Sequence, residues 1–423
     1  MSYRIAAIDV HKKMLAVVSA DIAVEGDYEF ERRQFSTSPD QLRALAEWLV
    51  EQKIQEVVME STAQYWRPVW QTLERYWKAE CQKWEGAGPV CGMLHLAQAQ
   101  SNRGPRGRKK DFVDAERLLK RLVAQELIMS FVTDAEQRLW RTVVRRKYQL
   151  TCDRVRLQNQ LESLLEEAQL KLSSLVSDLL GASARRMLKA LADGETSPPV
   201  LAALADQRLR ATQQQLCDAL GAARELNQVY RLLLKMALEE LQLIERQMDQ
   251  LDREIANLLS HYHDAVQRLA EVPGLGVNSA QQIIAEAGAA AATFPSDKHL
   301  ASWVGVCPGQ EESAGVSVSN RSPKGNRFMR RLLNQAANAA VKVKGSIFEV
   351  VFRRLLPRLG FKQAIWAIAH RLCRLIWKIL HQSVRYDERG PAVSQKSRGA
   401  RTVKMIRELR SLGYHVDLPV NPA

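Results

Sequence analysis

The chain has 423 residues, of which 46% are hydrophobic, and a formal net charge of +14 at pH 7. This length and apolar content are enough for two or three hydrophobic cores, so several domains are expected. No apolar run approaches the roughly 20 residues that cross a bilayer and no segment resembles a secretory signal, which predicts a cytoplasmic protein, nucleoid-associated when bound to DNA. The six cysteines contain no CxxC pair, which argues against a disulfide framework and a zinc site.

The first 130 residues alternate between predicted strands and helices. Strands are predicted from apolar runs and hairpin signals at 4–10, 13–23, 28–38, 55–61 and 88–96. Amphipathic spacing predicts helices at 38–52, 65–79 and 111–125. This alternation predicts an α/β domain around a mixed sheet.

Long helices are predicted from about residue 134 onward. A spacing of three and four residues joins one apolar set: Leu157, Leu161, Leu164, Ala168, Leu172 and Leu175. After a break at 194–199, a stricter set follows: Leu241, Ile244, Met248, Leu251, Ile255 and Leu258. The second set has the period of a coiled-coil seam. A helical hairpin that packs only on itself and a dimerising arm both fit this pattern.

The segment "EVPGLGVNSAQQIIAEAG" (271–288) has the pattern of a helix-hairpin-helix, whose turn contains Gly274 and Gly276. Free amides at the start of its second helix can hold a phosphate. A helix is predicted around 297–305, a polar loop at 308–326, helices at 327–343 and 361–380, and one short helix in the tail, at 401–413.

Positive charge is concentrated near the C-terminus. Residues 320–411 hold 22 Lys and Arg against four acids, a local charge of +18, so the rest of the chain sums to 14 − 18 = −4. Arginine predominates in this segment and suits bidentate contact with phosphate. The charge therefore indicates a nucleic-acid partner more than a solvated basic surface.

Four acids are placed at predicted strand ends and at a helix start. Asp9 closes the first strand, Glu60 closes a central strand, and Asp111 and Asp114 share one helix face. Each acid alone would be an ordinary surface or helix-capping carboxylate, but four that converge would repel one another unless divalent cations bound them. A pair of magnesium ions roughly 4 Å apart, which cuts phosphodiesters, needs such ligands.

Other candidate residues are less specific. Basic residues precede the two helix acids and are placed to hold a phosphate strand: Arg106, Arg108, Lys109 and Lys110. Physical reasoning alone treats the serines of the polar loop as filler, because a serine hydroxyl is a poor nucleophile without activation. These are Ser313, Ser317, Ser319 and Ser322. The histidines considered show no ligand spacing: His11, His95, His261, His263 and His299.

Several motifs together resemble a known family. In order along the chain they are "IDVHK", "VMES", "GRKKDFVDAERLL", "PGLG", "WVGVCPGQEESAG" and "RSPKGNRFMRRLLNQAA". This order resembles the insertion-sequence one-ten family of transposases, the DEDD or bridge-RNA-guided recombinases. The resemblance covers roughly residues 3–388. The helical arm matches in position alone.

The resemblance implies a multidomain α/β plus α protein. Its expected parts are a RuvC-like RNase H fold at 1–133, a coiled-coil helical arm at 134–262, a mostly α-helical transposase domain at 263–390 with the helix-hairpin-helix and a catalytic serine loop, and a basic extension at 391–423. It implies that Asp9, Glu60, Asp111 and Asp114 bind one or two Mg²⁺ ions. By its position in "EESAG", Ser313 is implied to attack DNA and to become linked to a phosphate.

The resemblance also implies partners: donor and target DNA, a structured non-coding bridge RNA, and further copies of the chain in a dimer or tetramer. The basic residues expected to neutralise phosphates are Arg321, Lys324, Arg327, Arg330 and Arg331. The acids and Ser313 lie about 200 residues apart, so a composite site formed between protomers is expected.

Two alternative functions fit the residues. A RuvC-like, Mg-dependent, structure-specific endonuclease would use the acids with water and leave Ser313 idle. A non-catalytic nucleic-acid-binding protein would keep the basic segment and tolerate the loss of Asp9. A sugar-kinase-like ATPase also begins with an acid on its first strand, but the glycine-rich phosphate loops of that class are missing from the sequence.

Overall fold

The computed structural model describes residues 3–22, 28–60, 63–84, 90–99, 110–309, 311–313, 316–319, 321–388, 402–403, 405–407 and 409–410. The chain forms two compact units, 1–135 and 136–423. Within the described residues, no helix is both long and apolar enough to span a membrane. The predicted extension at 391–423 lies outside the described residues except for the short helical pieces between 402 and 410.

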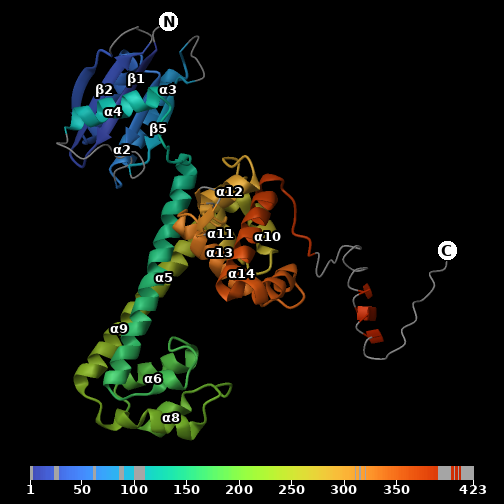
Figure 1. Cartoon of the computed structure of the whole chain (residues 1–423). Helices are drawn as coiled ribbons and strands as arrows, with labels where there is room; N and C mark the ends of the chain where they lie inside the picture. The colour runs from blue at the N-terminus through green and yellow to red at the C-terminus, as the bar shows by residue number, and fades with distance from the viewer. Residues whose placement is uncertain are drawn as a thin grey trace. The chain divides into compact units, whose positions relative to one another are not determined.

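A five-stranded mixed sheet forms the centre of the first unit (Figure 1). Its strands are β1 (Arg4–Val10), β2 (Met14–Asp21), β3 (Glu31–Ser36), β4 (Glu56–Glu60) and β5 (Met93–Ala97). Their order is β3-β2-β1-β4-β5, with β1, β2 and β3 antiparallel and β1, β4 and β5 parallel. The predicted α/β domain around a mixed sheet is confirmed.

Helices cover both faces of this sheet. One face packs against α1 (Pro39–Glu51), α2 (Trp66–Thr72), the π-helix η1 (Leu73–Trp77) and α3 (Lys78–Cys81). The other face carries Ala7 and Val58 and is covered by α4 (Asp111–Val123). Because side chains alternate along a strand, Asp9 shares the α4 face with Ala7, and Glu60 shares it with Val58. The sheet therefore presents Asp9 and Glu60 on the face that α4 covers.

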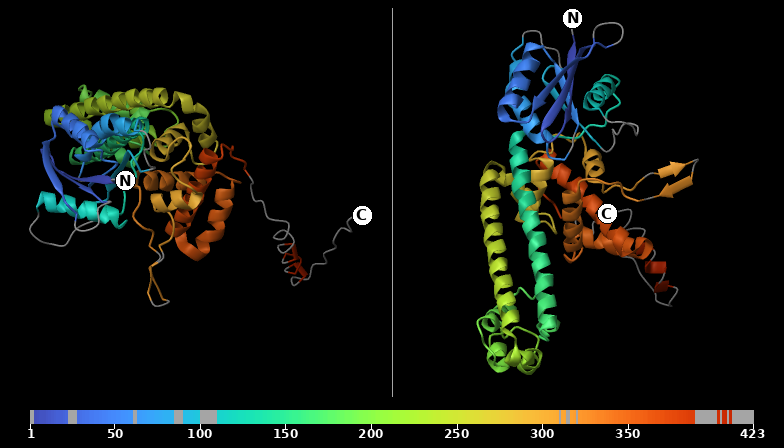
Figure 2. Two further views of the ribbon diagram at one scale, coloured as in Figure 1. Left: turned by 90° about the horizontal axis from the view of Figure 1, so that it is seen from above. Right: turned by 90° about the vertical axis from the view of Figure 1, so that its left-hand side faces the viewer.

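A long antiparallel helix pair forms the arm of the second unit (Figures 1 and 2). It consists of α5 (Ala135–Glu167) and α9 (Gln228–Leu258), which share buried leucines such as Leu161 and Leu241. The far end holds η2 (Leu172–Ser174), α6 (Ala182–Ala192), α7 (Pro198–Ala203), α8 (Gln213–Ala219) and η3 (Gly221–Glu225). Within one chain, α5 and α9 thus pair as a helical hairpin.

One helix of this arm is shorter than its apolar periodicity predicts. The spacing from Leu157 to Leu175 predicts a continuous helix, but α5 ends at Glu167. Gln169 has a φ of 58° and turns the chain. Leu172 then enters the same core from the short helix η2. The apolar period persists past the helix because the core, not the helix, requires those residues.

A second core joins the base of the arm to the C-terminal helices. These elements are η4 (Ser260–Tyr262), α10 (His263–Ala270), α11 (Val277–Ala287), α12 (Asp297–Val304), α13 (Arg327–Ala340) and α14 (Ile347–His381). Trp140 of α5 and Ile255 of α9 belong to this core. The arm and the C-terminal helices thus share a core at their junction, within one unit.

Two local features differ from the sequence-based expectations. The polar loop at 308–326 contains an antiparallel ribbon of β6 (Glu311–Ser313) and β7 (Val316–Ser319), visible in Figure 2. The helix predicted at 361–380 is the second half of α14, which is kinked at Gly360, where φ is 73°. A short, polar ribbon and a helix interrupted by Pro357 both have weak periodicity.

Candidate active site

Asp9 and Asp111 meet at one end of the sheet of the first unit. Asp9 lies near the end of β1, and Asp111 is the first residue of α4. The imidazole of His11 lies between them, with Nε2 3.1 Å from Asp9 Oδ2 and 3.2 Å from Asp111 Oδ1. In the described part of the chain, these three residues form a group whose ligand atoms all lie within 4.8 Å of one another. The sheet thereby brings together acids that are distant in the sequence.

The carboxyl of Asp9 is in an unfavourable place for a negative charge. Burial raises its pKa above the ordinary value, His11 partly offsets this, and the charges of Asp114 and Asp111 raise the pKa further. A partly buried carboxylate beside two others is stabilised by a proton or by a bound cation.

Glu60 and Asp114 share this end of the unit. The parallel register pairs Ile8 with Met59, so Glu60, the last residue of β4, stands at the level of Asp9 on β1. Asp114 lies one turn along α4 from Asp111, and its Oδ1 is 3.0 Å from Nη1 of Arg117. Neither acid belongs to the group of ligand atoms within 4.8 Å that the described residues form.

His11 and Arg117 are the contacts that the sequence reasoning missed. The sequence shows no ligand spacing at His11, yet this residue lies two positions after Asp9 and contacts its carboxylate. The amide of His11 donates to Met14 O at 3.0 Å. The signal was this two-residue spacing at a strand end. Two carboxylates and an imidazole fit a divalent cation. Oxygen ligands suit Mg²⁺, and an added imidazole broadens the choice to transition metals.

The basic segment before α4 is only partly described. Arg106, Arg108 and Lys109 lie outside the described residues. Lys110 is exposed at the N-terminus of α4, and its carbonyl accepts the amide of Asp114 at 3.0 Å. The acids at the start of α4 are also favoured by the positive end of the helix dipole.

In the second unit, Ser313 is the last residue of β6. Its Cα pairs with Val316 of β7, so it stands at the turn of the ribbon. Ser317 and Ser319 lie within β7. Ser322 follows the ribbon, and its hydroxyl accepts a hydrogen bond of 2.7 Å from the indole of Trp366.

The basic residues after the ribbon differ in exposure. Arg321, Lys324 and Arg327 are exposed. Arg331 is half-buried: its guanidinium lies 4.2 Å from the ring centroid of Tyr148, and Nη2 donates to a glutamine of α11 at 2.9 Å. Arg330 is half-buried and donates to backbone carbonyls. Of these five basic side chains, those of Arg321, Lys324 and Arg327 are therefore the exposed ones.

The two glycines of the helix-hairpin-helix lie in different surroundings. Gly274 has a φ of 85°, and a Cβ there would lie 2.7 Å from Ala340 N of α13. Gly276 caps α11, and a Cβ there would meet nothing within 4 Å. Gly274 thus permits close packing of α13, whereas the start of α11 at Gly276 is open.

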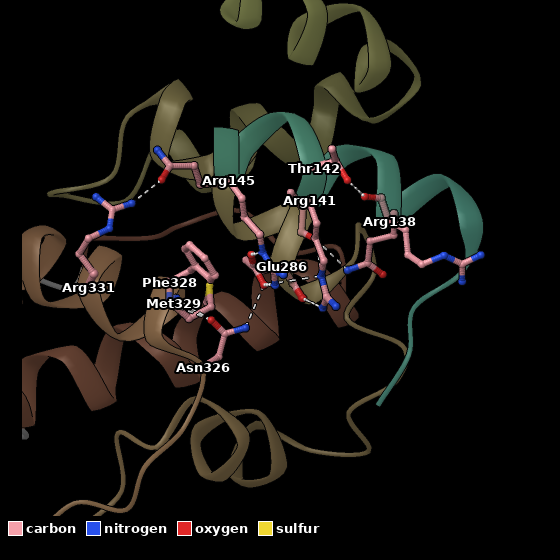
Figure 3. A network of polar contacts seen from close by, with 12 residues as sticks. Arg138, Arg141, Thr142, Arg145, Glu286, Asn326, Phe328, Met329 and Arg331 are labelled. Atoms are coloured by element: carbon pink, nitrogen blue, oxygen red, sulfur yellow. Dashed lines mark hydrogen bonds and ion pairs between the residues drawn. The ribbon is translucent and has the colours of Figure 1, made fainter. Parts of the chain in front are cut away.

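A buried carboxylate joins α5, α11 and the start of α13 (Figure 3). Glu286 is 2% exposed and accepts bonds of 2.8 and 2.9 Å from the guanidinium of Arg145. Arg141 lies 3.6 Å away, and Asn326 Nδ2 donates to Glu286 at 2.9 Å. Asn326 in turn caps α13 by accepting two of its amides. The network thus holds Asn326, where the segment after the β6–β7 ribbon meets α13, against α11.

Comparisons with known proteins agree with these features. A family model described as a transposase, of the DEDD type of IS110, matches residues 6–169, and one described as "Transposase IS116/IS110/IS902 family" matches residues 266–351. A "Probable family 20 transposase" of Pseudomonas aeruginosa is 31% identical over 160 residues, which are 36% of this chain and 46% of that protein.

Two further relatives extend the comparison. The "Transposase for insertion sequence element IS1328" of Yersinia enterocolitica is 23% identical over 290 residues, 67% of this chain and 75% of that protein. A "Pilin gene-inverting protein" of Moraxella bovis is 28% identical over 148 residues, 33% of this chain and 45% of that protein. The chain thus spans less than half of the Pseudomonas and Moraxella relatives. The two family models match the two parts of the chain in the expected order, and the chain belongs to the IS110 family of transposases.

Proposed function

We propose that the chain is a DNA recombinase that moves an insertion sequence by cutting and rejoining DNA strands. The observation that carries this proposal is the meeting of Asp9 and Asp111 from β1 and α4. The order β3-β2-β1-β4-β5, with acids near the ends of β1 and β4, supports a RuvC-like RNase H fold for this unit. The names of the relatives, which include a transposase and a gene-inverting protein, support the same activity.

The acids of the first unit would hold Mg²⁺ or a similar divalent cation. Asp9 and Asp111, whose ligand atoms lie within 4.8 Å of each other, would bind it directly, and Glu60 and Asp114 lie at the same end of the unit. Asp114 would exchange its bond with Arg117 for the cation. When bound, such a cation polarises a phosphodiester and stabilises the charge that develops on its oxygens.

Ser313 would be the nucleophile. Its Oγ would form a bond to the phosphorus of the DNA strand, while the bond from that phosphorus to one deoxyribose oxygen breaks and this oxygen leaves as a hydroxyl. Rejoining reverses the step with a hydroxyl from the other DNA. The exposed residues Arg321, Lys324 and Arg327 would neutralise the phosphates that flank the cut.

Target choice would be delegated to a structured RNA that pairs with donor and target DNA. We propose that this RNA comes from the non-coding end of the element, and that two or four copies of the chain assemble on the DNA. The proposed origin of the RNA is tested by sequencing the RNA that copurifies with the full chain. Its loops should complement both DNA junctions.

The catalytic proposal is tested by trapping the protein on labelled DNA in the presence of Mg²⁺. The wild type should yield a covalent adduct that resists denaturation, and Ser313→Ala should yield none. Asp9→Asn should also yield none while DNA binding persists. If the wild type instead cleaves DNA without forming an adduct, and Ser313→Ala still cleaves, the chain is an endonuclease that uses water. Recombination that survives Asp9→Asn would exclude the metal site.

A further inference from the structure

The two chain segments that enter and leave the β6–β7 ribbon lie against each other. We call these segments, 304–309 and 321–326, the loop base. A Cβ on Gly305 would lie 2.7 Å from Pro323 O, and one on Gly309 or Gly325 would lie within 3 Å of the opposite backbone. Such distances are below those that real Cβ atoms adopt. At these three glycines the two segments of the loop base therefore pack backbone to backbone, with no room for a side chain.

One side chain of α13 ties both segments of the loop base together. Nη1 of Arg330 donates to Pro323 O at 2.8 Å and also to Gly305 O. Its guanidinium stacks over the ring of Trp366, 4.6 Å from the centroid. These contacts engage one edge and one face of the guanidinium, which leaves fewer donors for a phosphate than an exposed arginine has.

The segment 321–326 is held by three further contacts. The indole of Trp366 donates to Ser322 Oγ at 2.7 Å, and the amide of Asn326 donates to Trp303 O at 3.2 Å. The Asn326 side chain reaches buried Glu286, as Figure 3 shows. Contacts from α11, α12 and α14 therefore all converge on the segment that leaves the ribbon.

We propose that Arg330 is a positioning residue that fixes the loop base and thereby the place of Ser313, and that it does not bind DNA phosphate. This inference rests on the proposed role of Ser313 as nucleophile. A nucleophile displaced by about 1 Å reacts roughly a hundredfold more slowly. Arg330 thus governs the rate of attack through the backbone, whereas its neighbour Arg327, exposed on the same helix, acts on affinity.

The test compares Arg330→Ala with Arg327→Ala in the full chain. At saturating DNA, Arg330→Ala should slow adduct formation by roughly a hundredfold, whereas the salt slope of DNA binding should stay unchanged because no phosphate contact is removed. Arg327→Ala should raise the Kd and reduce the salt slope by about 1. If Arg330→Ala instead lowers the salt slope and leaves the saturated rate unchanged, Arg330 binds phosphate and the inference is wrong.

Hydrogen exchange of peptides that cover 304–309 and 321–326 provides a readout without DNA. Arg330→Ala should speed their exchange about tenfold, as the loss of a hydrogen bond implies, and Arg330→Lys should restore part of the protection. Trp366→Phe, which keeps the ring and loses the donor to Ser322, should speed exchange at 321–326. Unchanged exchange in Arg330→Ala overturns the inference. A wild type without adduct refutes the nucleophile, and exchange alone then decides the role of Arg330.

Discussion

Glu286→Gln should destabilise the second unit far more than an ordinary loss of an ion pair. Glu286 Oε1 and Oε2 each accept a hydrogen bond from Arg145, and Oε2 accepts a second one from Asn326 Nδ2. The three distances lie between 2.8 and 2.9 Å. A glutamine has only one acceptor oxygen, so its amide would face a donor wherever it points. Breaking a buried pair costs 3–5 kcal/mol. Because the side chain of Arg145 is 29% exposed and can regain water, we expect about 3 kcal/mol.

Glu245→Gln is the matched control. Glu245 also accepts from two arginines, Arg185 and Arg154, but its side chain is 30% exposed on the arm. Pairs of this exposure contribute at most about 1 kcal/mol. The free energy of unfolding of both variants would be measured by denaturant titration of the full chain, followed by tryptophan fluorescence. Equal losses in the two variants would refute the assignment of Glu286 as a buried anchor.

Three other outcomes are expected. Gly274→Ala should cost about 1–3 kcal/mol of unfolding free energy, because its Cβ would enter the backbone of α13, whereas Gly276→Ala should stay within about 0.5 kcal/mol; denaturant midpoints test this. Hydrogen bonding to Arg185 lowers the pKa of Glu245, so this pair stabilises the fold above the unfolded pKa and loses its effect as the pH falls through the folded pKa. As the pH falls from about 5 to 3, the free energy of unfolding of the wild type should therefore decrease more steeply than that of Glu245→Gln. An equal decrease in both proteins would contradict this. Calorimetry should show weaker Mn²⁺ binding in Asp9→Asn, and wild-type affinity in that variant would remove Asp9 from the ligands.

The positions of the candidate acids could be predicted because they follow from local patterns. Asp9 and Glu60 end apolar strands, and Asp111 begins an amphipathic helix, so each position can be read from a few neighbouring residues. His11 escaped the same reasoning. Its place between Asp9 and Asp111 depends on how β1 meets α4, a contact between residues about 100 positions apart.

The role of Arg330 shows the same limit. In the sequence it is one of several arginines in a basic segment and is grouped with Arg327 as a phosphate contact. In the fold, α13 turns Arg330 toward Pro323 O and Trp366, while Arg327 remains exposed. Charge is a property of the residue, but its direction is set by the helix face and by the neighbours that the face meets.

The sequence by itself determined the α/β unit, the long helices and the order of the motifs, because apolar period and turn residues act over a few positions. Tertiary structure alone decided that α5 and α9 pair within one chain, that Glu286 is a buried anchor, and that glycines let the loop base close. These features depend on burial and on backbone approach between distant segments. A linear pattern holds no information on which distant groups will lose contact with water together.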